Sequence, residues 1–162
     1  MKLIIDIGNT RTKIAVFDGG KIKTFSAFER LATEDLTEIT SGQAISHCII
    51  SSVKDIDKTI IDFLKPAYYL IILDATTPLP IKNLYETPET LGKDRIAAAV
   101  AACHLFPGCD VLVVDAGTAI TYDLILGGKT YMGGGISPGL DMRFKALNAF
   151  TGKLPLISDI SP

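Results

Sequence analysis

The sequence predicts an α/β protein that contains one structural unit twice, and three observations support this fold class. A chain of 162 residues with 48% hydrophobic residues is long and apolar enough to bury a substantial core. Short β-prone runs alternate along it with segments whose apolar residues recur at helical spacing. The run LIIDIG at residues 3–8 returns as LVVDAG at residues 112–117, each time as a strand followed by an Asp-x-Gly turn.

Residues 1–73 have the pattern of a hairpin-rich sheet followed by alternating helices and strands. The turn Asp18-Gly19-Gly20 joins two β-prone runs as in a hairpin. Thr33 is the expected N-cap of a helix that stops at Gly42, and Pro66 ends a second, amphipathic helix. Strands are expected at residues 2–7, 12–17, 21–28, 47–51 and 68–73, and helices at residues 33–42 and 55–65.

The rest of the chain predicts a loop, an Ala-rich helix, three strands and a last helix. Three prolines make residues 74–91 mainly loop. Ser137-Pro138 has the pattern of an N-cap and a first helical residue. The Ala-rich helix is expected at residues 93–106 and the strands at residues 111–114, 119–126 and 129–132. The last helix has an apolar stripe of Leu140, Phe144, Leu147 and Phe150.

The repeated run divides the chain into two predicted domains, residues 1–110 and residues 111–162. Extended without a gap, the same alignment places Thr12 on Thr121 and Gly19 on Gly128. Chance similarity between two hairpins with glycine turns is the alternative explanation. The second copy is too short for the helix, strand and helix that complete the first. We therefore expect an incomplete second domain with an apolar sheet face that is partly uncovered.

Charge, hydropathy and cysteine count argue against several classes of protein. The 16 basic and 18 acidic residues give a net charge of −2, unlike a polybasic nucleic-acid or membrane-surface binder. No apolar run approaches the roughly 18 residues of a membrane span, and Asp6 interrupts the first run too early for a secretory leader. The three cysteines include no C-x-x-C motif, which indicates reduced and mostly buried thiols in a cytoplasmic protein.

The turn after the first strand carries groups suited to phosphate binding. Gly8 lets main-chain N–H groups approach a phosphate closely, and Asn9 and Thr10 add side-chain donors. Asp6 by itself repels phosphate, so its useful role is to hold a hydrated Mg²⁺ that binds the phosphates. An Asx-turn that only satisfies the hairpin is the alternative for this motif alone.

The second copy of the turn, Asp115-Ala116-Gly117-Thr118, strengthens the phosphate interpretation. Two such turns from facing domains can hold one polyphosphate from both sides, which is the arrangement of the actin-like, sugar-kinase-like architecture. Neither a G-x-x-x-x-G-K-[ST] loop nor a G-x-G-x-x-G loop occurs in the sequence. Any ATP chemistry therefore needs another phosphate-binding device, and the paired turns provide one.

The segment Gly92-Lys93-Asp94-Arg95 opens the Ala-rich helix and combines a carboxylate with a guanidinium. Asp94 is a candidate acceptor for the proton of a substrate hydroxyl, with helix capping as the alternative. Arg95 opposes the helix dipole at a helix start, which favours an anionic partner.

Two further segments are candidates with equally plain alternatives. Tyr85 lies in the loop with three prolines, where it either lines a substrate pocket or belongs to a small satellite core. The glycines of residues 133–139 permit close backbone approach to a ligand or to the other domain, and a flexible loop is the alternative.

Taken in order, these motifs resemble those of type III pantothenate kinases. The resemblance covers nearly the whole chain and implies a duplicated actin-like (ribonuclease H-like) α/β fold with mixed sheets and flanking helices. Members of this family continue well beyond this length, so we expect the second domain to lack its C-terminal remainder. The matching segments are Asp6-Ile7-Gly8-Asn9-Thr10, Gly92-Lys93-Asp94-Arg95, Asp115-Ala116-Gly117-Thr118, Gly133-Gly134-Gly135-Ile136-Ser137-Pro138-Gly139 and Thr151-Gly152-Lys153-Leu154-Pro155.

The resemblance also implies a function, the ATP-dependent phosphorylation of pantothenate to phosphopantothenate, which is the first step of coenzyme A biosynthesis. The family uses ATP with Mg²⁺ or another divalent cation, and K⁺ or NH₄⁺ as a monovalent cation. It acts in the cytoplasm as a homodimer, and no nucleic-acid or membrane partner is expected. The apolar stripe of the last helix is the surface that we expect a second copy to bury.

The site residues that the resemblance implies fall into four groups. Asp94 would be the catalytic proton acceptor, and Asp115 would bind the monovalent cation. Thr118 would contact an ATP phosphate, and Asp6 would hold Mg²⁺ through water. The pantothenate site would comprise Tyr85, Gly92, Lys93, Asp94 and Arg95. The ATP-phosphate loop would comprise Asp6, Ile7, Gly8, Asn9, Thr10, Arg11, Thr12 and Lys13.

Two other functions stay open at this point. Another kinase or phosphohydrolase of the same architecture would transfer the phosphoryl group to a different hydroxyl or to water. A transcription accessory factor would be a relative without enzymatic activity. Because a pure binder need not keep Asp6, Asp94 and Asp115 together, the sequence favours an enzyme.

Overall fold

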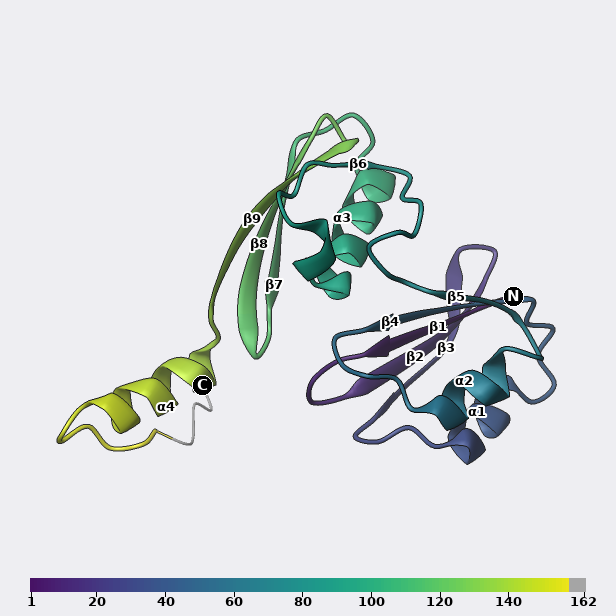
Figure 1. The fold of residues 1–162 in the computed structure, drawn as a ribbon, viewed down its shortest axis with the longest axis horizontal. Coiled ribbons are helices and arrows are strands. Elements are labelled where there is room, and N and C mark those ends of the chain that lie inside the picture. The colour runs from purple at the N-terminus through teal and green to yellow at the C-terminus, as the bar shows by residue number, and fades with distance from the viewer. Residues whose placement is uncertain (158–162) are drawn as a thin grey trace. The chain divides into compact units, whose positions relative to one another are not determined.

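The computed structural model describes residues 1–157, and their contacts group the chain into two compact units (Figure 1). The first unit comprises Met1–Thr77 and Glu89–Ala97, and the second comprises Pro78–Pro88 and the chain from Ala98 onward. These units are defined by contacts between residues, whereas the domain boundary predicted at residue 110 is placed where the sequence repeat begins again. That boundary stays a prediction.

The first unit is built on a five-stranded mixed sheet with the strand order β3-β2-β1-β4-β5. Strand β1 lies at its centre, antiparallel to β2 and parallel to β4. Strand β3 is antiparallel to β2, and β5 is parallel to β4. The elements are β1 (Lys2–Ile7), β2 (Thr12–Asp18), β3 (Lys21–Phe28), α1 (Thr33–Thr40), β4 (His47–Ser52), α2 (Lys58–Leu64) and β5 (Tyr69–Ile72).

The alternation of side chains along β1 builds the core of the first unit. Leu3, Ile5 and Ile7 are buried on one face, and their neighbours in register on β4 include Cys48 and Ile50. Helices α1 and α2 contribute Leu36, Ile60 and Leu64 to the same cluster (Figure 1). Burial of each Leu or Ile side chain contributes about 1.5–3 kcal/mol relative to its exposure.

The second unit contains a four-stranded sheet with the order β6-β9-β8-β7. Strands β7, β8 and β9 are antiparallel neighbours, and the short β6 is parallel to β9. Apolar side chains of β7 and β8 stay exposed, among them Leu112, Val114 and Leu124, in agreement with the uncovered face that the sequence predicts. Its elements are β6 (Lys82–Asn83), β7 (Val111–Ala116), β8 (Ala119–Leu126), β9 (Thr130–Pro138) and α4 (Leu140–Phe150). A 3₁₀ turn (Pro88–Thr90) and α3 (Lys93–Leu105) cross the boundary, because Glu89–Ala97 belongs to the first unit.

Several predicted boundaries are wrong, and tertiary pairing explains the larger differences. The expected loop at residues 74–91 contains β6, which becomes a strand because β9 pairs with it. The glycines that follow residue 132 belong to β9 and not to a loop, because β8 pairs with them. Helix α4 begins after Gly139 and not at Ser137-Pro138, which still pair with β8.

The first two helices also begin elsewhere than the sequence indicates. Helix α1 has Ala32 as its N-cap, whose N–H donates to Asp35 at 2.8 Å, so Thr33 is already helical. Helix α2 begins at Lys58 and not at residue 55, because Asp57 caps it.

The internal repeat is structural, with one residue fewer in its second turn. Ile7 pairs with Thr12 across the first turn, whereas Ala116 pairs with Ile120 across the second. The ungapped match of Thr12 with Thr121 is therefore wrong after the turn. The far hairpin turns then correspond as Gly19-Gly20 and Gly127-Gly128, and all four glycines have positive φ.

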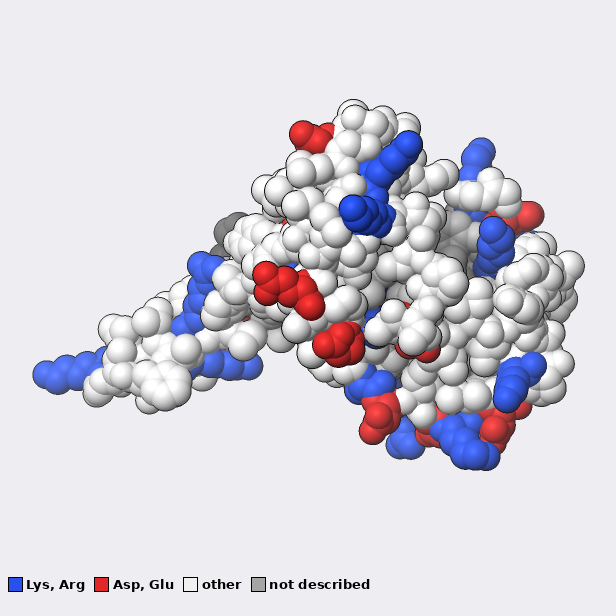
Figure 2. Space-filling model, turned by 45° about the horizontal axis from the view of Figure 1, so that its top comes forward, with Lys and Arg blue, Asp and Glu red and all other residues white. Residues whose placement is uncertain are grey.

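The cysteines, the helix lengths and the surface charge also bear on the sequence analysis. Burial raises the pKa of the Cys48 thiol to about 12. Cys103 is only half-buried and Cys109 is exposed, so the expectation of mostly buried thiols is wrong. None of the helices in the described part of the chain is long and apolar enough to cross a membrane. On the face drawn in Figure 2, basic and acidic side chains lie interspersed over the first unit.

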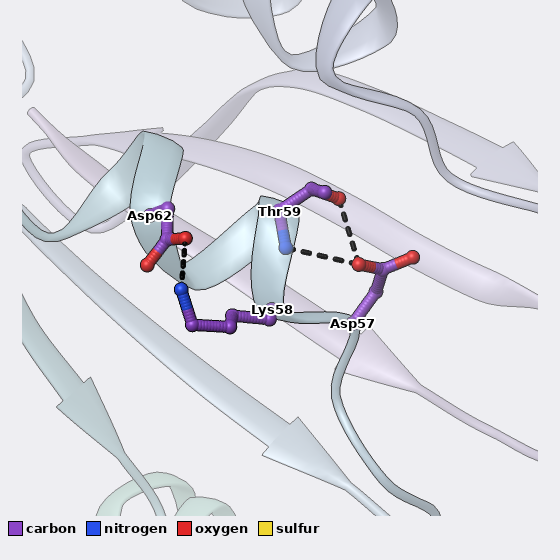
Figure 3. A network of polar contacts seen from close by, with 4 residues as sticks. All are labelled: Asp57, Lys58, Thr59 and Asp62. Carbon is purple, nitrogen blue, oxygen red and sulfur yellow. Dashed lines mark hydrogen bonds and ion pairs between the residues drawn. The ribbon is translucent and has the colours of Figure 1, made fainter.

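Hydrogen bonds from Thr59 to Asp57 fix the start of α2 (Figure 3). The backbone N–H and the hydroxyl of Thr59 donate to Oδ1 of Asp57 at 2.9 and 2.8 Å. These hydrogen bonds, the backbone one foremost, hold the pKa of the Asp57 carboxyl below its usual 3.8. Lys58, the first residue of the helix, pairs at 2.7 Å with Asp62 one turn further on, on the exposed side of the helix.

We predict that Asp57→Ala lowers the melting temperature, because the first turn of α2 loses its acceptor. Asp57→Asn is the matched control and should melt between the wild type and Asp57→Ala at pH 7, since an amide oxygen still accepts these hydrogen bonds but carries no charge. The folded-state pKa is depressed, so the charge-dependent contribution is present above pH 3.8 and disappears as the pH falls through the folded value. Thermal unfolding followed at pH 7 and pH 3 measures both effects, and equal melting of all three proteins would contradict them.

Candidate functional site

The turn after β1 holds the first group of predicted site residues. The N–H of Gly8 donates to the carbonyl of Arg11 at 3.0 Å and closes the turn. A Cβ at Gly8 would lie 3.1 Å from the same carbonyl oxygen, so a larger residue would have to push the turn open. Asp6 is half-buried near the end of β1, opposite Lys13 on β2.

The side chains of this turn divide into an exposed set and a buried pair. Ile7 and Thr12 are buried, with exposed fractions of 6% and 4%, so they belong to the core and not to the open surface of the turn. The side chains of Asn9, Thr10, Arg11 and Lys13 are exposed. The turn therefore offers cationic and polar donors around the half-buried Asp6.

Ser51, which the sequence analysis missed, lies beside Asp6 in the sheet. The two residues are partners in the parallel register of β1 and β4. Ser51 is 9% exposed, and its hydroxyl has no hydrogen-bond partner among the described residues. A buried hydroxyl without a partner is uncommon and calls for an explanation such as water or an ion. Its only signal in the sequence is its position at the end of a buried strand.

The start of α3 holds the second group of site residues. Oδ1 of Asp94 accepts a hydrogen bond from the Arg95 N–H at 2.8 Å, while the rest of the Asp94 side chain is exposed. A Cβ at Gly92 would lie 2.5 Å from that oxygen, so glycine is needed for this position of the carboxylate. Arg95 is buried at 5% exposure, and Lys93 donates to the Leu91 carbonyl at 3.3 Å.

An open cavity of about 660 Å³ lies next to this helix start within the first unit. Its volume is in the range of small-molecule sites. Gly92 and Lys93 were predicted for the substrate site, and the other lining residues were not. The cavity is lined by Ser52, Val53, Lys54, Asp55, Glu89, Thr90, Leu91, Gly92 and Lys93.

The second unit holds the predicted residues Asp115, near the end of β7, and Thr118, in the turn between β7 and β8, and both are exposed. The N–H of Gly117 donates to the Ala119 carbonyl at 2.9 Å. Gly139 packs against this turn, since its N–H donates to the Thr118 carbonyl at 3.0 Å. A Cβ there would lie 2.3 Å from the Gly117 carbonyl oxygen.

Tyr85, the remaining predicted residue, is half-buried after β6 in the second unit. Its N–H donates to Asn83 at 2.9 Å, and its ring stacks on Tyr131. The chain thus presents residues 6–13 and 92–95 in the first unit, and Tyr85, Asp115 and Thr118 in the second. Within residues 1–157, no three His, Cys, Asp or Glu side chains gather in a metal-binding cluster.

The two mixed sheets with their helices form an α/β fold, and solved structures share this fold. The chain superposes on ethanolamine utilization protein EutJ from Carboxydothermus hydrogenoformans with a TM-score of 0.50 at 14% identity, over 96% of this chain and 58% of that one. It superposes on a protein of Sinorhizobium meliloti described as a 2-dehydro-3-deoxygalactonokinase with a TM-score of 0.51 at 12% identity, over 93% and 58%. The fold is the actin-like, sugar-kinase-like α/β fold, as predicted.

The sequence comparisons then identify the family. The type III pantothenate kinase family model matches residues 2–162, and the chain belongs to that family. The type III pantothenate kinase of Phocaeicola vulgatus is 49% identical over 159 residues, which cover 98% of this chain and 66% of that protein. That of Bacteroides fragilis is 47% identical over 158 residues, which cover 97% and 65%. The chain therefore spans about two thirds of the length of these curated relatives.

We predict that Gly139→Ala destabilises the second unit, because the added methyl group meets the carbonyl oxygens of Gly117 and Thr118. The backbone of Gly139 is extended with φ −67°, so alanine adopts it without strain and the effect is purely steric. Overpacking of this kind costs about 1–3 kcal/mol in the free energy of unfolding.

Gly152→Ala serves as the matched control, since a Cβ there meets nothing within 4 Å. Denaturant unfolding of both variants checks the prediction. Equal stability of the two would show that the turn at Thr118 does not depend on Gly139.

Proposed function

We propose that the protein phosphorylates pantothenate with ATP and thereby opens coenzyme A biosynthesis. The observation that carries the proposal is the position of Asp94, an exposed carboxylate at the start of α3 beside a cavity lined by Gly92 and Lys93. Membership of the type III pantothenate kinase family along nearly the whole chain supports it. The proposal includes a cytoplasmic location, because the reaction consumes ATP.

The turn at residues 6–13 is proposed to bind the phosphates of ATP. The exposed side chains of Asn9, Thr10 and Lys13 supply donors and positive charge, and Gly8 keeps the main chain accessible. Thr118 is proposed to contact a phosphate from the second unit.

Mg²⁺ fits this turn, because Asp6 is a half-buried carboxylate and the Ser51 hydroxyl, which has no partner among residues 1–157, lies beside it in register. Oxygen ligands of this kind suit a hard cation. When bound, the ion neutralises phosphate charge and polarises the phosphoryl group. Asp6 is proposed to hold it through water.

Asp94 is proposed to accept the proton of the pantothenate hydroxyl. It lies in the first turn of α3, where a carboxylate interacts favourably with the helix dipole. Phosphoryl transfer passes through a loose transition state that needs little early deprotonation, so the carboxylate first orients the hydroxyl and then accepts its proton as the phosphoryl group is transferred. Lys93 and Arg95 are proposed to pair with the carboxylate of pantothenate, and Tyr85 to line its pocket.

Two finer proposals concern the monovalent cation and the oligomeric state. A K⁺ or NH₄⁺ ion near the exposed Asp115 would offset repulsion between that carboxylate and the phosphates.

A homodimer is proposed because α4 has no buried residue in the structure, and Phe150 is 88% exposed.

The deciding experiment measures ATP consumption by the whole protein with pantothenate and a panel of other small alcohols, with and without K⁺. Pantothenate should be the preferred acceptor. Preference for another alcohol would indicate a different small-molecule kinase of this fold, and turnover without any acceptor would indicate a phosphohydrolase.

We predict that Asp94→Asn lowers kcat by about 10²- to 10⁴-fold, because an amide keeps the shape but cannot accept the hydroxyl proton. Binding of pantothenate, measured by calorimetry, should stay close to that of the wild type. Glu86→Gln is the control, since Glu86 is an exposed carboxylate that does not line the cavity. Retention of more than about a tenth of the wild-type kcat would exclude Asp94 as the proton acceptor.

We predict that Asp115→Ala raises the KM for ATP and abolishes stimulation by K⁺. The ion loses its carboxylate partner, and the phosphates lose the charge that the ion supplied. Asp18→Ala, which removes an exposed carboxylate at the hairpin turn between β2 and β3, should leave the K⁺ response unchanged. Titration of the activity of both variants with KCl at constant ionic strength measures their K⁺ responses. An unaltered response in Asp115→Ala would move the cation site elsewhere.

A further inference from the structure

A buried hydrogen bond joins Tyr131 of β9 to Asp123 of β8. The Tyr131 hydroxyl donates to Oδ1 of Asp123 at 2.6 Å, and each residue is 1% exposed. A hydrogen bond to a carboxylate is stronger than one between neutral groups, and low local dielectric strengthens it further. The Tyr131 ring is therefore held in one place by its hydroxyl as well as by packing.

The ring of Tyr85 rests on this fixed ring. The two ring centroids are 6.3 Å apart, and the ring planes differ by 12°. The backbone holds the same arrangement, because the Leu84 N–H donates to the Tyr131 carbonyl at 2.9 Å. Tyr85 thus follows the position of Tyr131 through both its main chain and its side chain.

Gly133 leaves the space that the Tyr85 ring occupies. Its φ is +96°, and a Cβ there would lie 3.2 Å from Cδ2 of Tyr85. A register shift in β9 lies just before it, since Ile125 pairs with Tyr131 but Leu124 pairs with Gly133. Bulges of this kind redirect side chains, and here Met132 is the extra residue.

We propose that Tyr131, Asp123 and Gly133 are positioning residues for Tyr85 and set the affinity of the protein for its acceptor substrate. The proposal rests on the proposed function, in which Tyr85 lines the pantothenate pocket. A ring fixed before binding loses little side-chain entropy when the substrate arrives, so disturbance of its support weakens binding. The three residues contribute to recognition of the acceptor and not of ATP.

The first test compares Gly133→Ala with Gly135→Ala in the whole protein. Gly135 lies on the same strand, and a Cβ there meets nothing within 4 Å. Gly133→Ala should raise the KM for pantothenate by about two- to tenfold, the range expected for loss of one aromatic contact. The KM for ATP and kcat should stay near the wild-type values, and Gly135→Ala should change none of them.

A second variant guards against misfolding of Gly133→Ala, since alanine is strained at positive φ. Tyr131→Phe keeps the stacked ring but removes the hydroxyl that donates a hydrogen bond to Asp123. It should raise the KM for pantothenate in the same direction. In a Tyr85→Ala background, neither Gly133→Ala nor Tyr131→Phe should raise it further, because the residue they position is absent.

A readout without activity separates this proposal from the proposed function. In protein labelled with 3-fluorotyrosine, the ¹⁹F resonance of Tyr85, assigned with Tyr85→Phe, should shift in Gly133→Ala and stay in place in Gly135→Ala. An unshifted resonance, or an effect of Tyr131→Phe that persists in Tyr85→Ala, would overturn the positioning role. A shifted resonance together with an unchanged KM in Tyr85→Ala would instead remove Tyr85 from the substrate pocket.

Discussion

Strand β1 is the element on which the first unit depends, because it is paired along both edges. Antiparallel pairing with β2 and parallel pairing with β4 fix its register twice over. A shift of one residue would turn Leu3, Ile5 and Ile7 out of the core. The same constraint sets the place of Asp6, the closing hydrogen bond of Gly8 and the proximity of Ser51. The chemistry of the turn is thus a consequence of how the core is packed.

The sequence predicts what local patterns determine. Alternation, helix stops and glycine turns give nearly all the strands and helices of the first unit, and the repeated Asp-x-Gly turn gives the fold class. Pairing between distant segments determines the rest. Lys82 and Asn83 form a strand only because β9 lies beside them, and the glycines of β9, weak strand formers by themselves, are held by β8. Neither outcome has a local signal.

The candidate site likewise contains residues that the sequence identifies and residues that only the structure identifies. Asp6, Asp94, Asp115 and Tyr85 stand out in the sequence by residue type and by their place in a motif. Ser51 gains meaning only from the register that sets it beside Asp6. Tyr131 has no signal in the sequence beyond that of a strand residue, and only the structure joins it to Asp123 through a buried hydrogen bond.

The parallel pairing of β6 with β9 has a consequence for the order of events during synthesis. The buried cluster of the first unit uses residues from Leu3 to Leu64, so its core can close while the ribosome is still adding the second unit. Lys82 and Asn83 must instead wait for residues 130 and 131 to emerge before they acquire strand partners. Formation of this contact closes a long loop, which is slow relative to local hairpins. Tyr85 therefore reaches its final setting late, and a nascent chain passes through a stage in which one unit is folded while the aromatic pair is still unformed.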